Sequence, residues 1–137
     1  MGRAALRTVL AETCGKQGRA EEGLDLVAEG LAIVEQTGQR VDEAELHRLK
    51  GELMMIMNPG NQVEVEKSLR TAIDVARGQG ARLFELRATV SLARLLAKQG
   101  RRDEAHEMLN DIYSWFTQGF DTADLKDAKA LLDELCN

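Results

Sequence analysis

The tetrapeptide Lys-Gln-Gly-Arg occurs twice in this chain, at residues 16–19 and 98–101. The two copies lie 82 residues apart, which is two periods of about 41 residues and indicates an internal repeat. Each copy follows an apolar stretch and precedes a pair of acidic residues, at 21–22 and 103–104. Acidic residues favour the first turn of a helix, because they face the positive end of its dipole. The repeat therefore predicts turns that join one helix to the next.

A second set of turns alternates with the first. Gly38 and Gly80 each follow an apolar helical pattern, as a glycine just beyond a helix C-terminus does. Between them, Pro59 cannot continue a helix, and it disfavours helical backbone at Asn58. Together the turns predict seven helices, at about 3–16, 20–37, 41–57, 62–78, 82–98, 102–117 and 122–136.

The composition supports helices throughout. Ala, Leu, Glu, Arg and Lys are good helix formers and dominate the chain, whereas aromatic residues make up 4% and Pro59 is the one proline. Apolar residues recur with helical spacing, as at Leu24, Val27 and Leu31. With 137 residues, 44% of them hydrophobic, the chain fits a single domain over residues 1–137.

Small residues occupy equivalent places in the expected hairpins. Ala11, Gly51 and Ala93 do so in the first helices, and Gly23 and Ala105 in the second. Small residues where two helices cross closely are typical of the tetratricopeptide repeat (TPR). We therefore predict an all-α fold, a TPR-like α-α superhelix that forms a right-handed solenoid. It comprises three helical hairpins, at about 3–37, 41–78 and 82–117, and a C-terminal capping helix at about 122–136.

Three segments are similar to a known family. They read ELHRLKGEL at 45–53, ELRA and SLARL within 85–95, and YSWFTQGFDTADL at 113–125. They resemble the C-terminal TPR-like region of large bacterial signalling proteins, over roughly residues 38–136. In that family an adenylate/guanylate cyclase-like domain, or a DNA-binding output domain, precedes a P-loop ATPase-like module and a TPR tail. The resemblance implies a regulatory module, and it places the cyclase and ATPase activities in upstream domains.

No residue pattern predicts chemistry in this chain. Gly15-Lys16 is not a phosphate-binding loop, because Gln17 stands where such a loop has Ser or Thr. His47 and His106 fall in different helices and lack metal-ligand spacing, so we expect exposed helix residues. Adjacent carboxylates are explained as charges of first helical turns. We therefore expect no catalytic residue, no metal, no cofactor and no enzyme activity.

The net charge and the cysteines limit which classes of partner and which cellular compartment we expect. The formal net charge of −5 disfavours nucleic acid, which requires a basic surface. No apolar run approaches the roughly 20 residues that span a membrane, and no signal peptide follows Met1. Cys14 and Cys136 lie at opposite ends without CxxC spacing, which favours free thiols. We expect a cytoplasmic protein.

The inner face of the first helices is the surface on which TPR-like proteins hold peptides. By helical register, this face carries both acidic and basic residues, with the basic ones in the third repeat. They are Thr8, Glu12, Glu45, Arg48, Glu52, Met55, Arg87, Arg94 and Lys98. Two interpretations are open: the groove captures an acidic peptide, or Glu45 or Glu52 pairs with Arg87 or Arg94 between neighbouring helices.

Four of the five aromatic residues cluster between the sixth and seventh expected helices. They are Tyr113, Trp115, Phe116 and Phe120. Large rings bury much area, so we predict that they dock the capping helix, with a ligand cage as the alternative. On the first interpretation, Trp115→Ala lowers the melting temperature by several degrees.

The two ends of the chain differ in character. The first helix has no capping residue before it, so we expect a fragment of a larger protein whose apolar N-terminal face is exposed. A second copy could cover that face in a homodimer. The last helix has a charged outer face that suits the end of a stack. The alternatives are a stand-alone peptide-binding adaptor and, in another class, a small all-α ligand-binding protein or enzyme.

Overall fold

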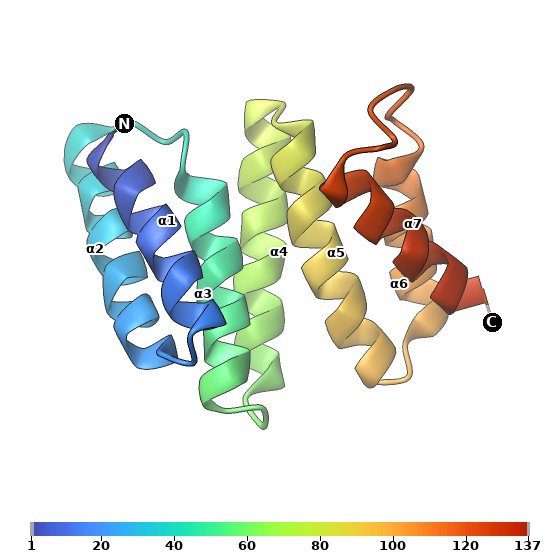
Figure 1. The fold of residues 1–137 in the computed structure, drawn as a ribbon, viewed down its shortest axis with the longest axis horizontal. Helices are drawn as coiled ribbons and strands as arrows, with labels where there is room; N and C mark the ends of the chain where they lie inside the picture. The colour runs from blue at the N-terminus through green and yellow to red at the C-terminus, as the bar shows by residue number, and fades with distance from the viewer. Residues whose placement is uncertain (1, 137) are drawn as a thin grey trace.

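The computed structural model describes residues 2–136, and within them every regular element is an α-helix. The elements are α1 (Arg3–Lys16), α2 (Ala20–Thr37), α3 (Glu43–Met57), α4 (Gln62–Gln79), α5 (Arg82–Lys98), α6 (Arg102–Tyr113) and α7 (Ala123–Cys136). In Figure 1, α1 and α2 lie at one end of the molecule, α3 to α5 lie in the middle, and α6 and α7 lie at the other end. The all-α prediction is confirmed.

The helices form two layers. Each helix packs against the next, and α1, α3, α5 and α7 also contact one another in sequence. Within the described residues, the backbones of α2, α4 and α6 do not approach one another in this way. The odd-numbered helices therefore line the inner face and the even-numbered helices the outer face of a TPR-like helical-repeat solenoid (Figure 1).

The two Lys-Gln-Gly-Arg copies adopt the same turn. Gly18 and Gly100 have φ values of 75° and 78°, in the left-handed region that suits glycine. The Arg19 N–H donates to the Cys14 carbonyl at 2.7 Å, and the Arg101 N–H donates to the Leu96 carbonyl at 2.8 Å. Each bond reaches back five residues and satisfies a free carbonyl at the end of a helix.

The arginine side chain of this turn joins the two helices that it separates. Arg101 donates from Nη1 to Gln99 Oε1 at 3.0 Å and from Nη2 to Glu104 Oε1 at 2.8 Å. Arg19 bonds the equivalent residues, Gln17 and Glu22, at 2.8 and 2.6 Å. The repeated tetrapeptide thus forms a turn whose arginine side chain also hydrogen-bonds to the first turn of the next helix.

The interior divides into two apolar clusters. One lies among α1, α2 and α3 and includes Val27, Val34, Leu46 and Leu53. The other spans α4 to α7, and the α3 residues Met54 and Met55 pack against it. Helix α3 therefore contributes side chains to both clusters.

Close helix packing explains the small residues. A Cβ added to Gly51 would lie 2.9 Å from Leu69 Cδ2 and 3.4 Å from the Val65 carbonyl oxygen. A Cβ added to Gly23 would lie 2.9 Å from Leu53 Cδ1. These distances require glycine where α3 meets α4 and where α2 meets α3.

Helix α6 is shorter than the sequence pattern suggests. It ends at Tyr113, whereas the pattern predicts an end near 117. The backbone then tightens, because Trp115 and Phe116 donate to the carbonyls three residues earlier, both at 3.1 Å. Ser, aromatic residues and Thr are poorer helix formers than Ala or Leu, and Gly119 adopts a φ of 80°. The aromatic segment is therefore a loop.

Candidate functional site

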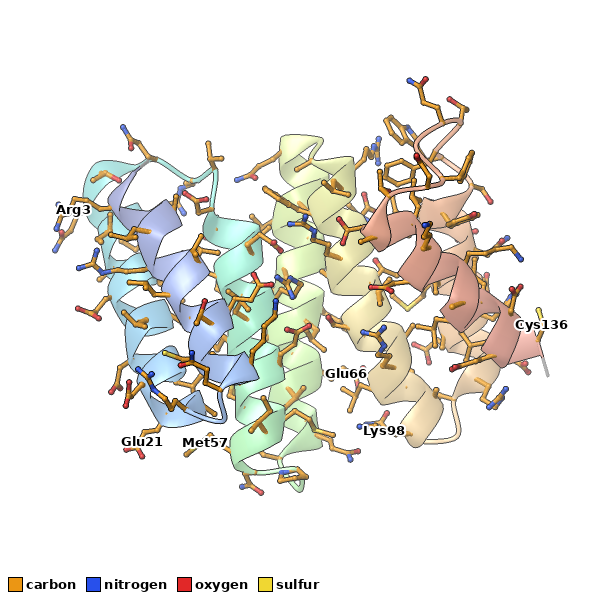
Figure 2. All side chains as sticks on the ribbon, viewed as in Figure 1. Arg3, Glu21, Met57, Glu66, Lys98 and Cys136 are labelled. Carbon is orange, nitrogen blue, oxygen red and sulfur yellow. The ribbon has the colours of Figure 1, made fainter. Side chains whose placement is uncertain are left out.

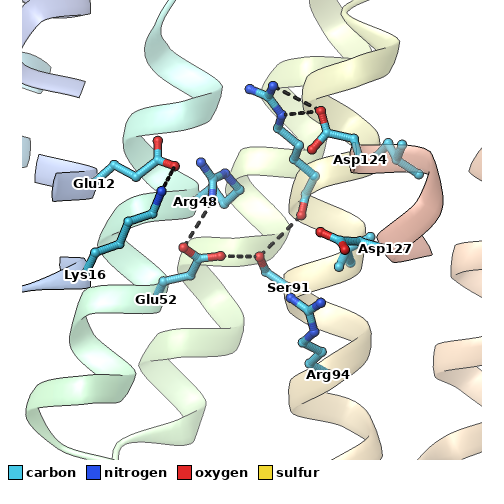
Figure 3. Close-up of a pocket in the computed structure, with 11 residues that line it drawn as sticks. Glu12, Lys16, Arg48, Glu52, Ser91, Arg94, Asp124 and Asp127 are labelled. Atoms are coloured by element: carbon cyan, nitrogen blue, oxygen red, sulfur yellow. Dashed lines mark hydrogen bonds and ion pairs between the residues drawn. The ribbon is translucent and has the colours of Figure 1, made fainter. Parts of the chain in front are cut away.

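A groove runs along the inner face of the solenoid. It contains a hollow of about 410 Å³, between α1 and α3 on one side and α5 and α7 on the other (Figure 3). We call this the charged hollow. It is lined by Glu12, Lys16, Arg48, Glu52, Leu86, Arg87, Val90, Ser91, Arg94, Asp124 and Asp127. All eleven of these residues belong to the odd-numbered helices that the fold brings together, and nine of them are charged or polar.

Arg87 connects three helices at the upper end of this hollow. Its Nη1 donates to Glu45 Oε1 on α3 at 2.8 Å. Its Nε donates to Asp124 Oδ2 on α7 at 3.1 Å. Burial lowers the pKa of Arg87, but hydrogen bonds to Asp124 and Glu45 outweigh that effect and raise the pKa above its ordinary value. Arg87 therefore joins α5 to α3 and α7 through ion pairs.

Arg48 extends the network along α3. Its Nε donates to Glu45 Oε2 at 2.7 Å, and its Nη1 donates to Glu52 Oε2 at 3.0 Å. Ser91 Oγ on α5 donates to Glu52 Oε1 at 2.5 Å (Figure 3). Glu45 and Arg48 are only 5% and 8% exposed. A buried ion pair needs such additional hydrogen bonds, and each partner depends on the other.

The pKa of Arg48 reflects these contacts. Burial alone lowers this pKa, but the hydrogen bond to Glu45 and the negative charges of Glu52 and Glu45 raise it well above the ordinary value. The guanidinium therefore stays charged. Its hydrogen bonds are directed to side chains of this chain.

Arg94 and Lys98 differ from these arginines. Arg94 lines the charged hollow, and both residues line a neighbouring hollow of about 310 Å³. Both side chains are exposed. Among residues 2–136, no carboxylate lies within ion-pair distance of either. They are cations with room for a ligand.

The neighbouring hollow is mainly apolar, and we call it the apolar hollow. Val65, Leu69 and Leu95 are its buried residues, and Met55 and Ile56 are more accessible. Ile56 is 54% exposed and also lines a third hollow of about 230 Å³ beside α1. The groove thus passes from a charged end to an apolar end.

The structure brings most of the predicted groove residues together. Glu12, Arg48, Glu52, Arg87 and Arg94 line the charged hollow, and Met55, Lys98, Glu52 and Arg94 line the apolar one. Thr8 is 9% exposed, and its hydroxyl donates to the Ala4 carbonyl at 3.0 Å. Glu45 is covered by its two arginine partners. These last two residues line neither hollow.

Four charged or polar residues that line the charged hollow are absent from the sequence prediction: Lys16, Ser91, Asp124 and Asp127. Two signals could have found part of this set. An acidic residue followed by leucine recurs at 45–46, 85–86 and 124–125, which places α7 in register with α3 and α5. Lys16 and Lys98 are also the same residue of the repeated tetrapeptide.

The aromatic cluster divides into a packed part and an exposed part. Tyr113 and Phe116 pack against the second apolar cluster. Trp115 and Phe120 are 56% and 44% exposed. Arg82 lies over the Trp115 ring, with its guanidinium carbon 5.4 Å from the ring centroid. Tyr113 and Phe116, and not Trp115, therefore pack against the apolar cluster to which α7 contributes.

The structure reveals one contact of a histidine that sequence spacing misses. His106 Nε2 lies 3.3 Å from the Sγ of Cys136. Cys136 lies at the C-terminal end of α7 (Figure 2). Thirty residues separate the two in sequence. Within the described part of the chain, no group of three or more His, Cys, Asp or Glu side chains is arranged to hold a metal. Cys14 is a buried free thiol and Cys136 an exposed one.

Burial lowers the pKa of the other histidine, His47, although the nearby carboxylate of Glu43 acts in the opposite direction. Its Nε2 lies 3.8 Å from Glu43 Oε2 on the same helix. His47 lines neither hollow of the groove.

No helix in residues 2–136 has both the length and the apolar character needed to cross a membrane.

Comparison with known proteins identifies two repeat segments. A family model described as the tetratricopeptide repeat matches residues 4–29 and 86–111. Each matched segment contains one Lys-Gln-Gly-Arg turn at the same position, joining α1 to α2 and α5 to α6. The hairpin of α3 and α4, with Pro59 in its turn, lies between them. No curated protein sequence matches the chain. The chain therefore contains a TPR-like region, formed by segments that are similar to tetratricopeptide repeats.

Proposed function

We propose that this chain is a protein-protein interaction module that holds a partner in its inner groove and carries out no chemistry itself. The observation that supports this most directly is the pair of cations without carboxylate partners among the described residues, Arg94 and Lys98, beside accessible apolar surface. The TPR matches support the same function, because repeats of this kind generally mediate protein-protein interaction.

The groove is well suited to a protein segment. It is open, it is continuous over α1, α3, α5 and α7, and its walls are tied by the Arg48 and Arg87 networks. A pre-organised surface binds with a smaller loss of conformational entropy than a mobile one. Extended or helical partner segments commonly occupy grooves of this type.

We also propose a role for this module within a larger signalling protein. The resemblance of residues 38–136 to bacterial signalling proteins supports a regulatory role beside a cyclase-like or DNA-binding output domain. We propose that residues 1–137 act there as one helical-repeat domain in the cytoplasm. A stand-alone peptide-binding adaptor is the alternative, and it would use the same groove.

A photo-crosslinking experiment tests the groove. Benzoylphenylalanine replaces Glu12, which lines the charged hollow, or Asp74, which is exposed on α4 and lines none of the groove hollows. After irradiation in bacterial extract, we expect protein adducts at position 12 and few at position 74. Mass spectrometry identifies the crosslinked segment. Equal labelling at both positions, or none at position 12, would contradict the proposed function.

A second copy of the chain is a further partner that we propose. Leu6, Val9 and Leu10 lie on the side of α1 that faces away from α2 and α3, and all three are exposed. A contiguous apolar helix face is self-complementary about a two-fold axis. This proposal concerns the end of the solenoid and leaves the groove free.

A further inference from the structure

We infer that the groove selects a partner segment in which an apolar side chain is flanked by carboxylates, seated over the apolar hollow against Arg94 and Lys98. This inference rests on the proposed function and specifies the chemistry of the partner. Its occupant is a protein segment, because the site combines an aliphatic surface with positive charge.

The apolar part of the site is accessible to a side chain. Met55 and Ile56 of α3 and Leu95 of α5 surround a hollow of about 310 Å³. Ile56 is more than half exposed, so a partner that covers it removes apolar surface from water. Burial of one leucine or isoleucine side chain strengthens binding by roughly ten- to a hundredfold. The hollow therefore favours an aliphatic residue of the partner.

The charges around the apolar hollow favour a partner segment with negative charge. Glu52 is the one carboxylate that lines it, and Arg48 and Ser91 already bind both of its oxygens. Arg94 and Lys98 remain without a carboxylate partner among the described residues. The apolar hollow is thus locally positive on a chain whose net charge is −5. Carboxylates on the partner complement it, and a basic segment is repelled.

The two cations are placed to act together. Arg94 and Lys98 are four residues apart on α5, so their side chains project from the same face of the helix. The guanidinium of Arg94 can bind a carboxylate through two parallel hydrogen bonds, whereas Lys98 acts as a compact charge. Two acidic residues on either side of an apolar one can therefore be bound at once.

Arg87 is not part of this selection. Its donors are directed to Glu45 and Asp124, and replacing it removes the tie between α3, α5 and α7. An effect of Arg87→Glu on binding would mix loss of structure with loss of contact. Arg94 and Lys98 are the residues whose substitution tests the inference.

The experiment uses the full 137-residue chain and a defined peptide. The probe is Gly-Glu-Glu-Leu-Glu-Glu-Gly, with fluorescein at its N-terminus and an amide at its C-terminus, and binding is measured by fluorescence anisotropy. Three matched peptides replace Leu by Ser, every Glu by Gln, or every Glu by Lys. A single-stranded oligonucleotide of similar length serves as a nucleic-acid arm. We expect the acidic leucine peptide to bind most tightly.

Two variants and one control locate the site. Arg94→Glu with Lys98→Glu should weaken binding of the acidic leucine peptide by about tenfold or more and strengthen binding of the lysine peptide. Ile56→Ser should weaken binding of the leucine peptide but not of its serine counterpart. Lys50→Glu with Lys67→Glu makes the same change of charge at exposed positions outside the hollows, and it should have little effect. Circular dichroism confirms that each variant remains helical.

The outcomes separate this inference from the proposed function. Equal binding of the acidic, neutral and basic peptides overturns the inference, as does equal loss in the groove variant and the control. Tighter binding of the oligonucleotide also overturns it. If these results occur while the position-12 crosslinks persist, the groove still holds a protein and only the assigned chemistry is wrong. If the crosslinks also fail, the proposed function falls with it.

Discussion

Gly51 shows how one missing side chain sets the distance between two helices. Its hydrogen atoms face Leu69 Cδ2 and Cγ, both 2.9 Å from where a Cβ would stand, and Leu69 is itself buried. The backbone carbonyl oxygen of Val65 also lies 3.4 Å from this position, so an added methyl group would contact both the Leu69 side chain and the α4 backbone. The close approach of α3 and α4 therefore depends on glycine at this position.

Substitution of two helical glycines by alanine should have opposite effects. Gly51→Ala overpacks the contact with Leu69, and we expect a loss of about 1–3 kcal/mol in the free energy of unfolding. Gly78→Ala adds a methyl group in open space on α4, so it should gain up to about 1 kcal/mol through helix propensity. Urea denaturation measures both. A gain in stability for Gly51→Ala would contradict the packing.

At the residue level, the sequence indicates which face of a helix a side chain occupies, but it does not indicate how deeply that side chain is buried. Helical register predicts that Arg48, Arg94 and Lys98 share one face, and the structure places each of them in the lining of one of the two hollows. It cannot show that Glu45 lies beneath two arginines, because burial depends on neighbouring helices. The interpretation that acidic residues pair across helices holds for Glu45 and Arg87. It does not hold for Arg94, which has no carboxylate partner among residues 2–136.

At the scale of the elements, only part of the aromatic cluster between α6 and α7 packs against the second apolar cluster. Phe116 packs against the second apolar cluster and meets Trp115 edge to face, with ring centroids 5.1 Å apart. Trp115 is mostly in solvent, with Arg82 above it. The sequence shows that these rings cluster, but the early end of α6 decides which of them are buried.

We expect Phe116→Ala to destabilise the protein more than Trp115→Ala. Loss of the Phe116 ring leaves a void beneath α7 and should cost about 2 kcal/mol or more. Trp115→Ala removes a largely exposed ring and should change the free energy of unfolding by less than about 1 kcal/mol. Thermal melts followed by circular dichroism compare the two. A larger effect of Trp115→Ala would restore it as the principal docking residue.

Four charged side chains join α4 to α6 on the outer layer. Arg70 pairs with Glu66 and Glu104, both at 2.9 Å. Arg101 pairs with the same two carboxylates, at 3.0 and 2.8 Å. Burial raises the pKa of Glu66, but hydrogen bonds from Arg70 and Arg101 outweigh it and lower the pKa. Hydrogen bonds from Arg101 and Arg70 likewise lower the pKa of Glu104.

These lowered pKa values predict a loss of stability in acid. A carboxyl group whose pKa falls on folding stabilises the fold fully above the unfolded pKa of about 4.3, and the contribution disappears as pH falls through the folded pKa. Glu66→Gln with Glu104→Gln should therefore be less stable at pH about 7 and lose less on acidification. Melting temperatures measured between pH about 7 and pH values below about 4.3 test this prediction. The protein with Glu64→Gln and Glu107→Gln, both at exposed positions, is the matched control. Parallel acid curves for all three proteins would exclude the effect.

At the scale of the whole molecule, the repeat determines most of the architecture. The turns at Gly18, Gly38, Gly80 and Gly100 are local features with positive φ, so their spacing predicts the helices well. The role of α7 in the groove was harder to predict, because Asp124 reaches Arg87 only after three hairpins have stacked. The contact of His106 with Cys136 depends on the same assembly of distant segments.

The exposed face of α1 predicts self-association. If Leu6, Val9 and Leu10 pack against a second copy, light scattering should show a mass approaching twice 15.1 kDa as concentration rises. Leu6→Glu with Leu10→Glu should return the protein to a monomer, because paired carboxylates would then meet in the interface. Val63→Glu, at an exposed position on α4, is the control. A wild-type protein that remains monomeric at high concentration would rule out this dimer.

The two apolar clusters meet at α3, which is also one wall of the groove. We therefore expect the α1–α3 part and the α4–α7 part to open as separate cooperative units. A ligand that touches both α3 and α5 bridges the two units across their boundary. Opening either part would release the ligand and lose its binding free energy. Occupancy of the groove should therefore convert stepwise unfolding into a single transition.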